Sequence, residues 1–186
     1  MVAASIFPCV ASSSTGQGRA ACRATTLGLL VGAVTFDRHP STILSPGRQP
    51  AVLTSLDRKF GLLADCGLDF VLALPMSPFL LQTSAEDFAT DLLATRLRAR
   101  SVSVGANFRY GYRAAGNTST LDATGRRLGF EARKVDLLNI AGGPVSSTRI
   151  RREVTAGRVR SANAVLGRSH SVEAVVSAGY GRRAAA

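Results

Sequence analysis

Short apolar runs separated by polar turns recur along the chain and predict buried β-strands. The clearest run covers residues 29–36 and leads into a polar turn at residues 37–40. Further runs cover residues 68–74, 101–104 and 130–138. Runs of this length are typical of strands that are buried on both faces, as in parallel sheets.

Between these runs, apolar residues recur at helical spacing. Thr54 with Asp57 resembles a capping box, and Gly67 ends the helix that follows it. Ser84 with Asp87 repeats that arrangement, before a helix that carries Phe88, Leu92, Leu93 and Leu97 on one face. Other helices are predicted over residues 118–128, 149–154 and 162–166. Because strands and helices alternate, we expect an α/β fold with a parallel sheet and helices on both faces.

Residues 145–151 predict a loop that leads into a helix and could bind an anion. Gly142-Gly143-Pro144 interrupts any earlier element, and a helical spacing resumes at Ile150. Ser147 or Thr148 could cap the new helix, whose first N–H groups favour an anion. Arg149 and Arg151 lie two residues apart and therefore diverge, so that one could face a pocket and the other solvent. On its own, the pattern is more typical of an ordinary capped helix on a basic surface.

Two further loops follow predicted strands. In open α/β sheets ligands bind beyond the carboxyl ends of the strands, so the loop at residues 36–40 is a candidate binding site. In the loop at residues 105–111, glycines would allow the backbone to approach a ligand, and Asn107 could both donate to and accept from a planar ring. Phe108 could contact a ring or lie in the core, and both interpretations remain open.

These segments resemble, in order along the chain, the motifs of bacterial FAD synthetases. Residues 35–40 are similar to a Thr-Phe-Asp-x-His-Pro segment, and residues 105–111 to a Gly-x-(Asn/Asp)-Phe-x-(Phe/Tyr)-Gly loop. Residues 146–151 resemble the Ser-Ser-Thr-x-x-Arg motif of enzymes that transfer an adenylyl group from ATP. Residues 164–168 and 171–176 resemble the junction into a riboflavin kinase domain.

The resemblance implies a Rossmann-like nucleotidyltransferase domain that joins ATP and FMN to give FAD and pyrophosphate, with Mg²⁺ on the phosphates. By the same resemblance, Ser147, Thr148 and Arg151 would bind the ATP phosphates. The residues expected to contact flavin or nucleotide are Asn107, Phe36, His39 and Pro40. The domains implied are residues 29–170 for the adenylyltransferase and residues 171–186 for a stub of the kinase.

Residues 1–28 form an atypical segment that we expect to be poorly ordered. FAD synthetases carry a first strand and a Gly-x-Phe-Asp-x-x-His-x-Gly-His motif here, whereas this chain has only a strand-like Ile6-Phe7 followed by residues 8–14 without histidine. Since residues 1–36 contain no acid, either a transit peptide or a shifted reading frame would explain the composition. The missing histidine pair leaves no catalytic residue assigned.

Composition excludes several other classes of protein. The three cysteines lack C-x-x-C spacing, which argues against a disulfide framework or a zinc site and favours the cytoplasm. No apolar stretch is long enough for a membrane span. The net charge of +11 could suit a basic nucleic-acid-binding module, but the arginines are scattered.

Two more alternatives are a non-catalytic nucleotide-binding remnant and a chain that lacks a central strand and does not fold stably.

Overall fold

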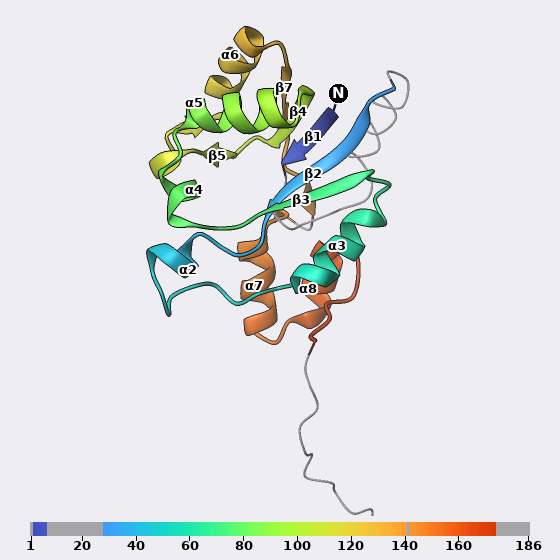
Figure 1. The fold of residues 1–186 in the computed structure, drawn as a ribbon. Helices are drawn as coiled ribbons and strands as arrows, with labels where there is room; N and C mark the ends of the chain where they lie inside the picture. Colours follow the sequence, from blue (N-terminus) through green and yellow to red (C-terminus); the bar gives the residue numbers. More distant parts are fainter. Residues whose placement is uncertain (1, 7–27, 141, 174–186) are drawn as a thin grey trace, which may run out of the picture.

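A five-stranded parallel sheet forms the centre of the protein (Figure 1). The computed structural model describes residues 2–6, 28–140 and 142–173. The strands are β1 (Val2–Ile6), β2 (Leu30–Phe36), β3 (Phe70–Leu74), β4 (Ala99–Gly105) and β7 (Glu131–Val135), in the spatial order β3-β2-β1-β4-β7. Every neighbouring pair in this sheet is parallel. The expected Rossmann-like α/β fold is therefore confirmed.

Helices flank the sheet on both sides (Figure 1). α3 (Leu56–Ala64) lies on one side, next to β3. On the other side lie α5 (Ala85–Asp87), its continuation η1 (Phe88–Arg96) and α6 (Thr118–Leu128). The main core lies between this second group and the sheet; its fully buried members include Val34, Leu93, Val102, Val104 and Leu121.

The remaining elements are short or lie below the sheet. α2 (Ser41–Leu44) follows β2, and α4 (Pro78–Gln82) follows β3. One hairpin pairs β5 (Arg109–Tyr110) with β6 (Gly116–Asn117), and η2 (Tyr112–Ala114) lies between these two strands in the sequence. A second hairpin pairs β8 (Asn139–Ile140) with β9 (Gly143–Pro144). α7 (Ser147–Thr155) and α8 (Val159–Leu166) pack together around Ile150, Val165 and Leu166.

The first strand corrects the sequence analysis. We expected residues 1–28 to lie outside the domain, but Val2–Ile6 pairs with β2 on one side and with β4 on the other. A five-residue strand rich in alanine and serine gives a weak apolar signal, whereas pairing on both edges satisfies its backbone donors and acceptors. The described structure thus has a central strand, contrary to the alternative that this strand is lost. Residues 7–27 lie outside the described residues.

Candidate functional site

The carboxyl ends of the parallel strands bring the predicted loops to one edge of the sheet. Phe36 at the end of β2 lies opposite Leu74 of β3, and Gly105 at the end of β4 lies opposite Val135 of β7. β1 separates β2 from β4, and the direction of strand succession reverses around it. Such a reversal is where open α/β sheets bind ligands, which makes this edge the candidate site.

Asp37 fastens the loop after β2 to the loop after β3. Its N–H donates to the Leu74 carbonyl at 3.1 Å, and its Oδ1 accepts from the Met76 N–H at 2.8 Å. Its Oδ2 pairs with Arg38 Nε at 3.2 Å. Burial raises the pKa of Asp37, but the hydrogen bonds from Met76 and Arg38 outweigh it and lower the pKa overall. Our sequence analysis gave Asp37 no role, although its position directly after a buried strand was a usable signal.

His39 lies on the same loop with its ring orientation fixed. Its Nδ1 accepts from the Ser41 N–H at 3.1 Å and lies 2.6 Å from the Ser41 hydroxyl oxygen. An accepting Nδ1 carries no proton, so the neutral ring has its proton on Nε2. Partial burial and the nearby positive charge of Arg151 lower the pKa of His39. The charge of Arg151 on α7 thus acts on His39, which lies far from it in the sequence.

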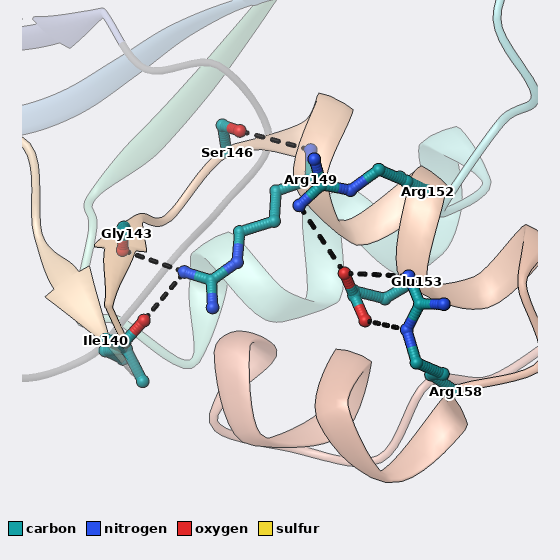
Figure 2. A network of polar contacts seen from close by, with 7 residues as sticks. All are labelled: Ile140, Gly143, Ser146, Arg149, Arg152, Glu153 and Arg158. Carbon is teal, nitrogen blue, oxygen red and sulfur yellow. Dashed lines mark hydrogen bonds and ion pairs between the residues drawn. The ribbon is translucent and has the colours of Figure 1, made fainter.

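The N-cap of α7 is an earlier residue than we expected. Ser146, rather than Ser147 or Thr148, is the N-cap, and its hydroxyl accepts from the Arg149 N–H at 3.2 Å (Figure 2). An N-cap has extended backbone angles, which Ser146 adopts at φ −149° and ψ 151°. Ser147 and Thr148 are thus the first two helical residues, whose N–H groups have no acceptor within the helix. Within the part of the chain that the structure describes, neither of their hydroxyls has a hydrogen-bond partner.

The two arginines of the motif diverge, as the spacing predicted, and each donates to backbone carbonyls. The half-buried Arg149 directs Nη1 at the carbonyls of Ile140 and Gly143, at 2.7 and 2.8 Å (Figure 2). Arg151 donates from Nε to the Ala51 carbonyl at 2.7 Å, which fixes its guanidinium near His39. Each side chain therefore holds a different segment against α7.

The loop after β4 places Asn107 and Phe108 in different environments. Asn107 is exposed at the carboxyl edge. Phe108 stacks on Tyr110 with ring centroids 5.3 Å apart and packs against the main core. The core interpretation of Phe108 is confirmed. Among the residues that the structure describes, the Asn107 side chain forms no hydrogen bond to His39 or to α7, so its ligand contact stays a prediction.

Phe36 and Pro40 bracket the loop that carries His39. Phe36 is half-buried at the end of β2, and its carbonyl accepts from Lys59 Nζ at 3.1 Å. Pro40 precedes α2 and has helical backbone angles. Neither position tests the proposed contacts with flavin or nucleotide. Lys59, which we did not single out, adds a positive charge at this edge.

Glu153 forms a second polar network on α7 that the sequence did not reveal. The carboxylate is buried and accepts from Arg158 at 2.7 and 3.3 Å, with Arg152 at 3.6 Å on its other side (Figure 2). The hydrogen bond from Arg158 is the main cause that lowers the pKa of Glu153 to about 2. This network joins α7 to the start of α8.

The described part of the chain contains no cluster of three His, Cys, Asp or Glu side chains that could hold a metal ion. Within the same part, no helix combines the length and the apolar composition that crossing a bilayer requires.

Comparison with known proteins places this site in context. The family model described as FAD synthetase matches residues 18–149. Bifunctional riboflavin kinase/FMN adenylyltransferase of Escherichia coli (strain K12) is 29% identical over 144 residues, which are 77% of this chain and 46% of that protein. The protein of the same description from Listeria monocytogenes is 33% identical over 152 residues, 80% of this chain and 47% of the relative. This chain therefore spans about half the length of these relatives.

A solved structure supports the fold independently. The crystal structure of a macrolide-efflux protein from Streptococcus pneumoniae superposes with a TM-score of 0.75 at 18% identity, covering 90% of this chain and 65% of that one. At this identity the likeness concerns the fold alone. The family match covers well over half of the chain, so the chain belongs to the FAD synthetase family.

Proposed function

We propose that this chain binds MgATP at the start of α7 and serves as an FMN adenylyltransferase module that makes FAD and pyrophosphate. The observation that carries the proposal is the start of α7, where Ser147 and Thr148 follow the Ser146 cap and Arg151 acts by its charge on His39. The relatives named above carry this activity in their names.

Helix α7 supplies the chemistry that phosphates need. Its first N–H groups and the hydroxyls of Ser147 and Thr148 would donate to phosphate oxygens, and the helix dipole favours the negative charge. Arg151 uses Nε for the Ala51 carbonyl, so its terminal nitrogens remain to grip the triphosphate. His39, held neutral, would donate from Nε2 to the same phosphates or to FMN.

The other loops would hold the flavin nucleotide. Asn107 would bind a planar ring through its amide, and Phe36 and Pro40 would provide apolar contacts beside His39. An oxygen of the FMN phosphate would then form a bond to the α-phosphorus of ATP. The bond between that phosphorus and the bridging oxygen would break, releasing pyrophosphate. Such a reaction depends on positioning and on charge stabilisation more than on a covalent nucleophile.

Mg²⁺ would arrive with the nucleotide. The nearest acid on the loop, Asp37, already uses both oxygens for Met76 and Arg38, and the described residues offer no other cluster of ligands. Magnesium in nucleotide sites is commonly held by phosphate oxygens and water with few protein ligands. The chain would accordingly recognise MgATP as its substrate, in the cytoplasm where both nucleotides occur.

A second candidate is a nucleotide-binding remnant with little turnover. The family's histidine motif falls on residues 8–14, which lack histidine and lie outside the described residues. Loss of groups that stabilise the transition state lowers turnover while leaving binding of ATP in place.

A nucleic-acid-binding module is less well supported, because the basic side chains on α7 are engaged with carbonyls and with Glu153.

Calorimetric titration of MgATP into matched variants tests the proposal. Arg151→Ala removes a charge-assisted contact and should weaken ATP binding by roughly ten- to a hundredfold. Arg160→Ala removes an exposed charge on α8 and should leave ATP affinity nearly unchanged. Equal losses in the two variants would indicate a diffuse basic surface, and unchanged affinity in Arg151→Ala would remove the proposed phosphate site.

A further inference from the structure

We infer that Arg149 is a positioning residue for the phosphate site, which it orients by fixing the β8–β9 hairpin to helix α7. The inference rests on the proposed function, because it concerns how the same site is held in place. The Arg149 guanidinium itself points toward the hairpin (Figure 2).

The hydrogen bonds of Arg149 join the two strands of the hairpin at its turn. Ile140 is the last residue of β8 and Gly143 the first residue of β9, and these two residues face each other in the ladder. One nitrogen, Nη1, donates to both of their carbonyls. The Val145 N–H then donates to the Leu138 carbonyl at 2.7 Å, which fixes the strand that leaves the turn.

That strand leads directly to the helix cap. Pro144 ends β9, and Ser146 begins the capping of α7 only two residues later. Ser146 in turn accepts from the N–H of Arg149. Arg149 is therefore bonded to the approaching chain through its side chain and to the cap through its backbone. A shift of the hairpin would move Ser147 and Thr148 with it, and small misplacements of binding groups strongly weaken transition-state and substrate contacts.

Two further observations argue that the arginine serves the hairpin. A cation in the first turn of a helix opposes the helix dipole, so Arg149 is not there to stabilise α7 itself. The guanidinium also packs closely on the turn, because a Cβ built at Gly143 would lie within van der Waals contact of Arg149 Nη1, at 3.4 Å.

The test compares ligands that share the adenosine group and differ in phosphate. Arg149→Met should weaken MgATP binding about tenfold, while adenosine binding, followed by NMR, stays within about twofold of the parent chain. Arg149→Lys retains a charged donor and should recover most of the MgATP affinity. Gly143→Ala adds a methyl group at van der Waals distance from the guanidinium and keeps Arg149, so this variant should bind MgATP nearly as well as the parent chain. Arg160→Met serves as the control for lost charge.

The outcomes separate this inference from the proposed function. Unchanged MgATP affinity in Arg149→Met, or equal losses for MgATP and adenosine with a lower melting temperature, would overturn the positioning role. If Arg149→Met does not fold, Arg149→Gln, whose shorter side chain cannot reach both carbonyls, would overturn it by binding MgATP as tightly as the parent chain. A parent chain that binds no MgATP at all would refute the proposed function itself.

Discussion

At the scale of single residues, His39 and Arg151 form the part of the site where two distant segments act on each other. Ser41 holds the imidazole through Nδ1, and Ala51 holds the guanidinium through Nε. Neither side chain can turn away without losing a hydrogen bond. The groups left over, Nε2 of His39 and the terminal nitrogens of Arg151, are donors, and donors are what a phosphate requires.

The pKa of His39 should respond to Arg151. Burial and the Arg151 charge both lower it from the ordinary value of 6.5, so Arg151→Gln should raise it part of the way back. Because the folded state binds the proton less well than the unfolded chain, this group stabilises the fold above about pH 6.5 and that contribution declines as the pH falls. NMR titration of the ring proton, assigned with His39→Gln, measures the shift. An identical pKa with and without Arg151 would contradict the proximity of the two groups.

Residue types alone identified only part of this chemistry. The sequence indicated that Arg149 and Arg151 diverge, because side chains two apart on a helix cannot share a face. It could not indicate that Arg149 binds Ile140 and Gly143 or that Arg151 reaches Ala51, since those contacts depend on how the hairpin and the loop before α3 pack on α7. The choice of Ser146 as the cap likewise depended on backbone angles that three adjacent hydroxyl residues leave open.

At the scale of secondary structure, the corner between α7 and α8 depends on one buried carboxylate. Glu153 is almost fully covered, and Arg158 binds both of its oxygens. A buried carboxylate is tolerated when charged donors surround it. The network therefore holds the turn between α7 and α8.

Removing Arg158 should destabilise the protein in a pH-dependent way. Arg158 holds the pKa of Glu153 at about 2, compared with 4.5 for an unperturbed glutamate. The ionised pair stabilises the fold fully above about pH 4.5, and this contribution disappears as the pH falls toward 2. Urea unfolding should show Arg158→Met less stable than the parent chain at pH 7, with a smaller difference at pH 3. Arg160→Met is the control on the same helix, and a difference independent of pH would contradict this account.

Elements with strong local signals were predictable, and those with tertiary causes were not. β2 and α6 follow the expected ranges closely, because an apolar run and an Asn-capped, Gly-stopped helix need no further information. The helix after Ser84 has the expected cap, but η1 continues with π-type hydrogen bonds, such as Leu97 N–H to the Leu92 carbonyl. β1 lacks an apolar pattern and is defined by its neighbours, and the short α2 and α4 were missed.

At the scale of the whole molecule, the sheet brings the loops of the proposed nucleotide site to one edge, while residues 8–14 lack the histidine motif that the resemblance implies. The sheet order brings the loops after β2, β3, β4 and β7 to one edge regardless of what residues 8–14 contain. Binding of ATP and formation of FAD can therefore depend on different segments of this protein. The net charge of +11 would further favour anionic ligands at low salt without specifying them.

FAD formation by the full chain should be weak or absent. The phosphate site on α7 would bind MgATP, but the groups that stabilise charge in the transition state are missing from the sequence at residues 8–14. Incubation of the purified chain with FMN and MgATP, followed by chromatography, measures the product. Robust conversion to FAD would show that the histidine motif is dispensable here.

The location of bound nucleotide is the most direct test of the central claim. Titration of the ¹⁵N-labelled chain with MgATP should shift the amide resonances of Ser147, Thr148 and Arg151 and the ring resonances of His39, since these groups make up the proposed phosphate site. The Arg126 and Arg127 amides near the end of α6 should remain unshifted, because no phosphate site is proposed there. Saturable shifts confined to the α7 start and to His39 would support the account, whereas shifts spread over the basic surface, or none at the start of α7, would contradict it.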